Sequence, residues 1–74
     1  MTFEEFRNDI INKIDFRPSW SRKGQFVFNY IEETYGDVAR HVQFVDNMDC
    51  FCVDDNIDSF IILCYRALKE NNQI

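Results

Sequence analysis

The predicted fold depends most on residues 19–36, which read Ser-Trp-Ser-Arg-Lys-Gly-Gln-Phe-Val-Phe-Asn-Tyr-Ile-Glu-Glu-Thr-Tyr-Gly. Apolar residues recur here at helical spacing, and two aromatic residues widen the stripe. One face carries Trp20, Gly24, Val27, Phe28, Ile31 and Tyr35, and a flanking face carries Phe26 and Tyr30. So wide an apolar surface is typical of a helix buried on more than one side. We therefore expect this helix at the centre of the fold, capped by Ser19 or Ser21 and ended by Gly36.

Gly24 is unexpected inside this helix, because glycine in a helix interior costs about 1 kcal/mol relative to alanine. Two explanations are open. Another part of the backbone approaches closely at this position, or the helix begins nearer residue 24 than residue 20.

A first helix is predicted upstream, where Thr2 and Glu5 form a capping box. Its apolar stripe consists of Phe3, Phe6, Ile10, Ile11 and Ile14. Arg17-Pro18 ends it, because the residue before a proline is pushed out of the helical region.

Two further helices are predicted downstream. Asp37 caps a short one with a stripe of Val38, Ala39 and Val42, and Val45 is a further candidate. Residues 46–53 have no helical period and are either extended or irregular, with Phe51 able to dip into the core. Asp54 or Asp55 caps the last helix, and Asp58 adds negative charge to its first turn. The stripe of that helix is Ile57, Phe60, Ile61, Cys64 and Leu68.

These elements predict an all-α fold, a compact orthogonal bundle of three main helices and one short helix. Hydrophobic residues make up 46% of the chain, and two glycines and one proline leave no linker, so residues 1–74 are expected to form a single domain. The longest apolar run, residues 60–65, is far shorter than the roughly 20 residues of a membrane span. Acidic residues at 4, 5 and 9 argue against a signal peptide, so we expect a cytoplasmic location.

The formal net charge of −5 argues against general binding of a phosphate backbone. The charge is uneven along the chain. Residues 13–23 hold four bases and one acid, whereas residues 41–65 hold five aspartates and no Lys or Arg. These runs are either solvated surface or a recognition surface at one end, which is the basic end or an acidic end that steers a basic partner.

Nothing in the chain matches a metal or catalytic motif. Cys50-x-Cys52 lacks a second closely spaced ligand pair, so we expect no zinc site and interpret the three thiols as buried and reduced. Asp54-x-Asn56-x-Asp58 resembles the start of a calcium loop but has Ser59 where glycine is required. The single histidine, His41, is expected to be a partly buried structural side chain. We therefore expect no enzymatic activity and no cofactor.

Two clusters remain as candidate binding surfaces. Trp20-Ser21-Arg22-Lys23 brings together residue types that dominate binding energy at interfaces, unless Trp20 belongs to the core. Ile62, Leu63 and Tyr65 lie off the stripe of the last helix, so either that helix is buried on two sides or they form an exposed apolar patch.

The chain resembles small proteins of phages and prophages with the pattern R-x-G-Q-x-x-F-N, then an alanine, then D-P-F. The matching residues are Arg22, Gly24, Gln25, Phe28, Asn29, Ala39, Asp49 and Phe51, and Cys50 replaces the proline. The resemblance implies a phage origin rather than an activity, and it marks Arg22, Gln25 and Asn29 as candidates for structural or contact roles.

These observations predict a small phage-type binding protein in the host cytoplasm. It would occupy a surface of a host protein or ribonucleoprotein, as an inhibitor of a defence nuclease similar to anti-CRISPR proteins. The alternatives are a nucleic-acid accessory that uses the Lys13–Lys23 face, and a self-associating phage structural or assembly protein. The candidate partner-binding residues are Trp20, Arg22, Lys23, Gln25, Asn29, Asp54, Asp55, Asp58 and Tyr65.

Overall fold

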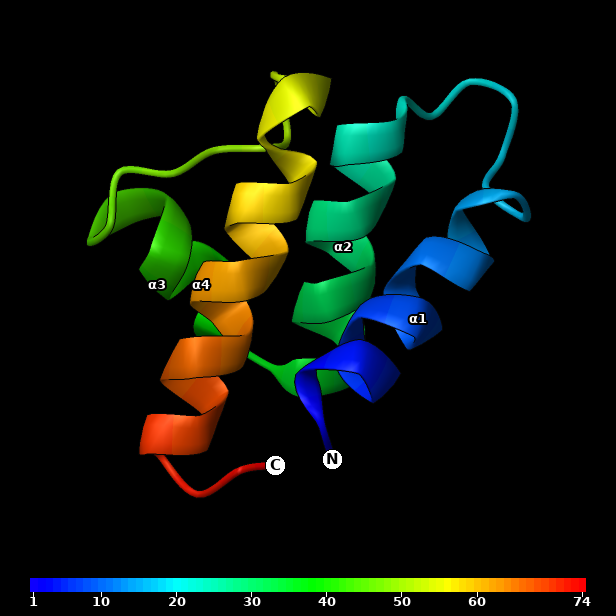
Figure 1. Cartoon of the computed structure of the whole chain (residues 1–74). Coiled ribbons are helices and arrows are strands. Elements are labelled where there is room, and N and C mark those ends of the chain that lie inside the picture. Colours follow the sequence, from blue (N-terminus) through cyan, green and yellow to red (C-terminus); the bar gives the residue numbers. More distant parts are fainter.

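The computed structural model describes residues 1–74 and contains only helices (Figure 1). They are α1 (Phe3–Ile14), α2 (Lys23–Tyr35), α3 (Val38–Phe44), the 3₁₀ helix η1 (Asp54–Asn56) and α4 (Ile57–Glu70). The predicted helical class is confirmed, with three long α-helices and one short one. No helix combines the length and the apolar composition that a membrane span requires.

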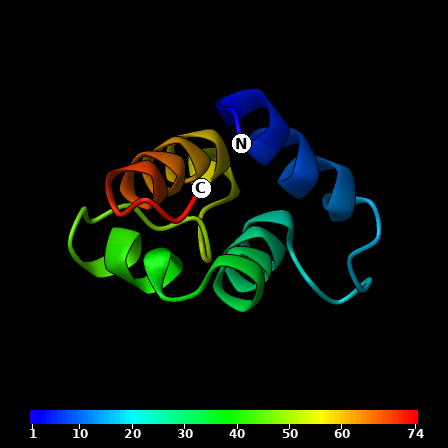
Figure 2. The same ribbon diagram turned by 90° about the horizontal axis from the view of Figure 1, so that it is seen from below.

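The four α-helices are arranged in a ring around one core. Each α-helix packs against the next along the chain, α4 also packs against α1, and η1 contacts α2 and α4. Figure 2 shows α1 and α4 on one side of the molecule and α2 and α3 on the other. α2, which forms within residues 19–36, packs against α1, α3 and η1, so it is buried on more than one side as its wide apolar surface predicted. Phe26 and Tyr30 on its flanking face are only half-buried, and they stack on each other with ring centroids 6.0 Å apart.

The core is a single cluster of 14 buried apolar residues to which every α-helix contributes. It consists of Phe6, Ile10, Ile14, Val27, Phe28, Ile31, Val38, Ala39, Val42, Cys50, Phe60, Ile61, Cys64 and Leu68. All but Cys50 belong to the predicted helical stripes, so the 3.6-residue periodicity identified the buried faces correctly.

The capping box that begins α1 is present as predicted. The backbone N–H of Glu5 donates to the Thr2 hydroxyl oxygen, and the backbone N–H of Thr2 donates to the Glu5 carboxylate. The helix ends at Ile14, four residues before Pro18, in a hydrogen-bonded turn rather than at the proline itself.

The start of α2 differs from the prediction. The helix begins at Lys23, and neither Ser19 nor Ser21 caps it. The N-cap residue Arg22 makes no side-chain capping hydrogen bond. Instead, the Gly24 N–H donates to Asp54 Oδ1 of η1 over 2.9 Å, so a residue 30 positions further along the chain satisfies the helix terminus.

Gly24 also permits a close approach of two backbones, as one of the two explanations for its position required. A Cβ atom at residue 24 would lie 1.8 Å from the carbonyl oxygen of Cys50. The Cys50 thiol donates to the Gly24 carbonyl oxygen at 3.4 Å. Both explanations for Gly24 therefore hold, because the helix also begins only one residue earlier.

The structure corrects several predictions for residues 37–56. Asp37 occupies the N-cap of α3 but makes no side-chain capping bond, and Val45 is exposed. Residues 46–53 are irregular, and Cys50 is fully buried. Phe51 is partly buried and packs against the core as expected, with its ring 5.6 Å from that of Phe28. Asp54 and Asp55 do not cap α4, because they lie within η1 and Asn56 takes the N-cap position.

A polar cluster ties α1 to α2 outside the apolar core. Asp9 Oδ2 accepts hydrogen bonds from the hydroxyls of Tyr30 (2.8 Å) and Tyr35 (3.0 Å), and Asp9 Oδ1 accepts from Lys13 Nζ at 3.3 Å. Partial burial by itself raises the pKa of Asp9, but the three hydrogen bonds outweigh it and hold the pKa below 3.8. Burial and the neighbouring carboxylate raise the pKa of Tyr35 to about 12.

We therefore expect this cluster to make stability depend on pH at both ends. The folded-state pKa of Asp9 lies below its ordinary value of 3.8, so its contribution is present above that value and is lost as the pH falls through the folded-state pKa. The folded-state pKa of Tyr35 is raised from 10.0 to about 12, so its contribution is present below pH 10 and is lost between pH 10 and about 12.

Urea unfolding at a series of pH values, followed by circular dichroism, measures both effects. Asp9→Asn should make the free energy of unfolding less dependent on pH in the acid range. Tyr35→Phe should make it less dependent on pH in the alkaline range. Asp15→Asn is the control, because Asp15 is exposed and its side chain makes no hydrogen bond. If the free energy of unfolding depends on acid pH in the same way in Asp9→Asn and in Asp15→Asn, Asp9 does not contribute in this way.

Candidate functional site

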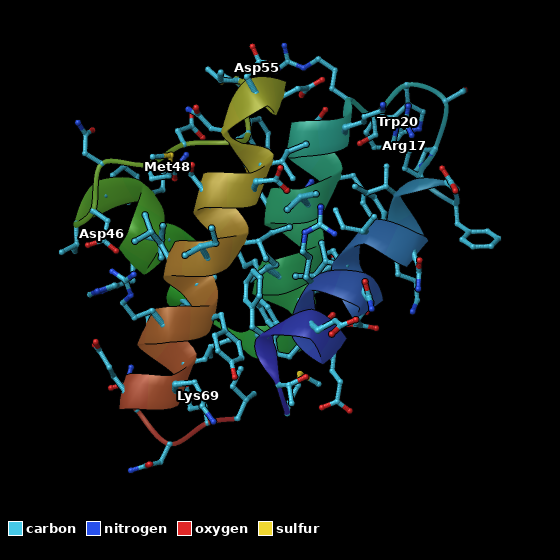
Figure 3. All side chains as sticks on the ribbon, viewed as in Figure 1. Arg17, Trp20, Asp46, Met48, Asp55 and Lys69 are labelled. Atoms are coloured by element: carbon cyan, nitrogen blue, oxygen red, sulfur yellow. The ribbon has the colours of Figure 1, made fainter.

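The connection between α1 and α2 presents two large aromatic side chains to solvent. Phe16 is 83% exposed and Trp20 is 75% exposed, so neither belongs to the core. Of the two interpretations of Trp20, the structure therefore excludes a core residue. We call residues 15–22 the aromatic loop, and Figure 3 shows Arg17 and Trp20 on it.

The aromatic loop is held in one shape by its own hydrogen bonds. The Arg17 guanidinium donates to the carbonyl oxygens of Ile14 and Ser21, both at 3.0 Å. The Ser21 N–H donates to the Pro18 carbonyl oxygen at 3.0 Å, and Ser21 is buried. These bonds bridge the two ends of the loop, so Phe16 and Trp20 project from a braced turn rather than from a loose linker.

A surface groove of about 520 Å³ lies on one side of Trp20. It is lined by Arg17, Ser19, Trp20, Ser21, Arg22, Lys23, Asp54, Asp55 and Ile57. Trp20 also lines a smaller hollow of about 210 Å³. Four residues of α2 line the same hollow, namely Phe26, Asn29, Tyr30 and Glu33. Trp20 therefore borders two depressions.

The groove brings opposite charges together. Arg22 and Lys23 come from the basic run of the sequence, and Asp54 and Asp55 come from the acidic one. The expectation of a basic end and an acidic end is therefore wrong at this place. The reason is local, since Asp54 binds the N-terminus of α2 and Arg22 donates to the carbonyl oxygen of Phe51 at 3.0 Å. These two bonds fold the acidic segment back against the basic one.

The other predicted site residues lie in different places. Gln25 and Asn29 are half-buried on α2, and Asn29 lines the smaller hollow. Asp58 is on α4, where it pairs with Arg7 of α1 at 3.3 Å. The hydroxyl of Tyr65 donates to the carbonyl oxygen of Met1, and its ring packs against Phe3 and Phe6. Asp58 and Tyr65 therefore do not join the groove beside Trp20.

The cysteines and the histidine show no arrangement for chemistry. Burial raises the pKa values of the Cys50 and Cys64 thiols, to about 12 for Cys50, so both are poor nucleophiles at neutral pH. Cys52 is exposed rather than buried, and His41 is exposed rather than partly buried, so both of those predictions are wrong. No group of three or more His, Cys, Asp or Glu side chains is placed to hold a metal ion.

Sequence reasoning missed Phe16 as a surface residue. A signal was available, because Phe16 falls outside the stripe of α1 and directly precedes Arg17-Pro18, where the helix was expected to end. An aromatic residue off the buried face and at a helix end has few core neighbours within reach.

Comparisons of the chain with protein-family models, with curated protein sequences and with solved structures found no match.

Proposed function

We propose that this chain is a binding protein that occupies a surface of a partner protein, with the aromatic loop as its main contact. The observation that carries the proposal is the exposure of Phe16 and Trp20 on a loop braced by hydrogen bonds. Both aromatic residues keep a large apolar area in contact with water, and such areas mark interaction surfaces.

The braced loop favours binding because ordering a flexible segment at an interface costs free energy. Immobilising a side chain on association costs roughly 0.5–1.5 kcal/mol, and loop ordering adds to this. Residues 15–22 are already held by Arg17 and Ser21, so that cost is reduced before the partner arrives. Trp and Arg are also the residue types most enriched among those that dominate binding.

The groove beside Trp20 indicates the chemistry of the partner. A partner side chain here would meet an apolar wall, three bases and two acids. We expect a protein surface with an apolar pocket for Trp20 and polar groups of both signs around it. The resemblance to small phage proteins supports a host protein or ribonucleoprotein in the cytoplasm. An inhibitor of a host defence nuclease, similar to anti-CRISPR proteins, is the form of the proposal to test first.

The alternative of nucleic-acid binding is weaker for a structural reason. An exposed Trp beside bases suits a single strand, on which aromatic side chains stack against nucleobases. Asp54 and Asp55 line the same groove, however, and would repel the phosphates. A gel shift at low salt that retains single-stranded DNA or RNA would favour this alternative over protein binding.

Trp20→Ala tests the proposal most directly. Tagged wild-type chain is used to recover its partner from nuclease-treated host lysate, and the affinity is then measured by titration calorimetry. If Trp20 is a dominant contact, its removal should weaken binding by at least about 30-fold, the equivalent of roughly 2 kcal/mol.

Phe44→Ala is the matched control, because Phe44 is an equally exposed aromatic residue on α3, outside the aromatic loop. We expect it to bind normally. Equal affinities of wild type and Trp20→Ala, or equal losses in both variants, would remove the aromatic loop as the contact.

We also propose that the helices cross steeply, as an orthogonal bundle, and that residues 1–74 unfold as one unit. The ring of pairwise contacts around one apolar cluster supports both. Inter-helix angles from an NMR structure would test the first, and coincident fluorescence and circular dichroism melting curves would test the second.

A further inference from the structure

The solvent face of α4 carries an ordered series of side chains. Asp58, Ile62 and Arg66 follow one another at intervals of four residues, and Lys69 comes three residues later. They share one face at 3.6 residues per turn. All four are exposed, and Ile62 is the single large apolar residue among them, with 43% of its surface accessible. The acidic Asp58 therefore lies at the start of this face, Ile62 at its middle, and the basic Arg66 and Lys69 at its end.

An apolar groove of about 480 Å³ lies beside Ile62. Phe3, Ile62 and Tyr65 supply its apolar part, and Arg66, Lys69 and Glu70 surround it. The groove has a firm wall, since the Tyr65 hydroxyl is bonded to the Met1 carbonyl oxygen and the rings of Phe3 and Tyr65 meet edge to face at 5.4 Å. A side chain the size of isoleucine could enter it.

The charges along this face are self-complementary in one orientation. If two copies of α4 pack antiparallel about a twofold axis through Ile62, the residue four positions before Ile62 faces the residue four positions after it. Asp58 then meets Arg66 of the second copy, about 6 Å along the helix from the axis on each side. A parallel pair would place Asp58 beside Asp58 and Arg66 beside Arg66.

The groups that would form these pairs are available. Arg66 and Lys69 take part in none of the three ion pairs of the chain. Asp58 pairs with Arg7 in its own chain, but 73% of its side chain remains exposed and it retains capacity for a second base. In a chain with a net charge of −5, two unpaired bases beside an apolar groove favour an acidic occupant.

We propose that this face of α4 binds a second copy of the chain in an antiparallel homodimer. Ile62 of each copy enters the groove of the other, and Asp58 pairs with Arg66 across the interface. A twofold interface uses the same patch on both copies, as this arrangement does. Phe16 and Trp20 do not line the groove, so the dimer would present two aromatic loops. The proposal does not depend on the proposed function, and the two can fail separately.

Sedimentation velocity of the purified chain over a range of concentrations tests the proposal. Because the patch is small, we expect a weak, concentration-dependent dimer that is clearly populated at about 0.5 mM chain. Ile62→Lys should yield a monomer at the same concentration. Val53→Lys is the matched control, since Val53 is 45% exposed and lies outside α4, and it should dimerise as the wild type does.

Two charge variants test the antiparallel arrangement. Asp58→Lys and Arg66→Glu should each weaken self-association at least about tenfold, because like charges would meet in the homodimer. An equimolar mixture of the two should dimerise again, since lysine at 58 then meets glutamate at 66, and Asp58 meets Arg66. Thermal melting of each variant checks that it is folded, and neither substitution touches the core.

Three results would overturn the proposal. The wild type could remain monomeric at about 0.5 mM, a concentration that populates even weak dimers. Ile62→Lys could dimerise as well as Val53→Lys. The mixed charge variants could fail to recover association. If the wild type is monomeric and recovers a different protein from lysate that Ile62→Lys does not, the face belongs to that partner instead.

Discussion

Gly24→Ala is expected to lower the free energy of unfolding by about 2–4 kcal/mol, although alanine is the better helix former. The new Cβ atom would lie 1.8 Å from the Cys50 carbonyl oxygen and 2.9 Å from Asp54 Oδ1. The first of these is a backbone atom, so residues 49–51 must move as a unit. That movement would disturb the Gly24 N–H bond to Asp54 and the bond from the Cys50 thiol to the Gly24 carbonyl oxygen.

Urea denaturation followed by circular dichroism measures this loss. Gln25→Ala is the control, because it introduces alanine at the next position of the same helix without the clash, and we expect a change within about 0.5 kcal/mol. The opposite sign is also informative. If Gly24→Ala stabilises the protein by up to about 1 kcal/mol, as helix propensity alone predicts, the two backbones do not approach closely in solution.

Phe60→Ala is expected to have the largest effect on stability, about 3–5 kcal/mol. Phe60 is fully buried on α4, and its ring lies 5.8 Å from that of Phe28 on α2. Truncation removes apolar contacts on both sides of the core and leaves a cavity that the rigid helices cannot fill. A domain of this size has only roughly 3–5 kcal/mol of net stability, so most of the variant should be unfolded at 25 °C.

Trp20→Ala is the matched comparison, since it truncates an even larger aromatic residue that is 75% exposed. We expect the free energy of unfolding to change by no more than about 0.5 kcal/mol. Thermal melting of the two variants beside the wild type measures the contrast. A cooperative loss of several kcal/mol in Trp20→Ala would mean that the indole packs against the protein, and would argue against the aromatic loop as a free contact surface.

Much of the helical architecture could be predicted because its causes are local. The Thr2 and Glu5 capping box, the glycine end of α2 and the apolar spacing of each stripe involve residues within one or two turns of each other. The start of α2 could not be predicted in this way. Its terminal N–H is satisfied by Asp54, and only the folded chain brings η1 to that terminus.

The candidate site was predicted in part. Trp20, Arg22 and Lys23 lie together, as their closeness in sequence implied, and Trp20 is exposed. The addition of Asp54 and Asp55 to the same groove could not be predicted, because it requires residues 49–56 to fold back on α2. Asp58 was expected in the same acidic surface but points toward α1, since its place on α4 is set by helical periodicity rather than by charge.

The sequence by itself determined which segments are helical and which of their faces are buried, because periodic apolar spacing needs only the geometry of one helix. Tertiary structure alone decided that the Cys50 carbonyl oxygen packs closely against Gly24, that Asp54 caps α2 and that acidic and basic runs share one groove. Each of these contacts joins residues 26 or more positions apart. Their formation depends on how four helices close around one core, and no local pattern of residues specifies that closure.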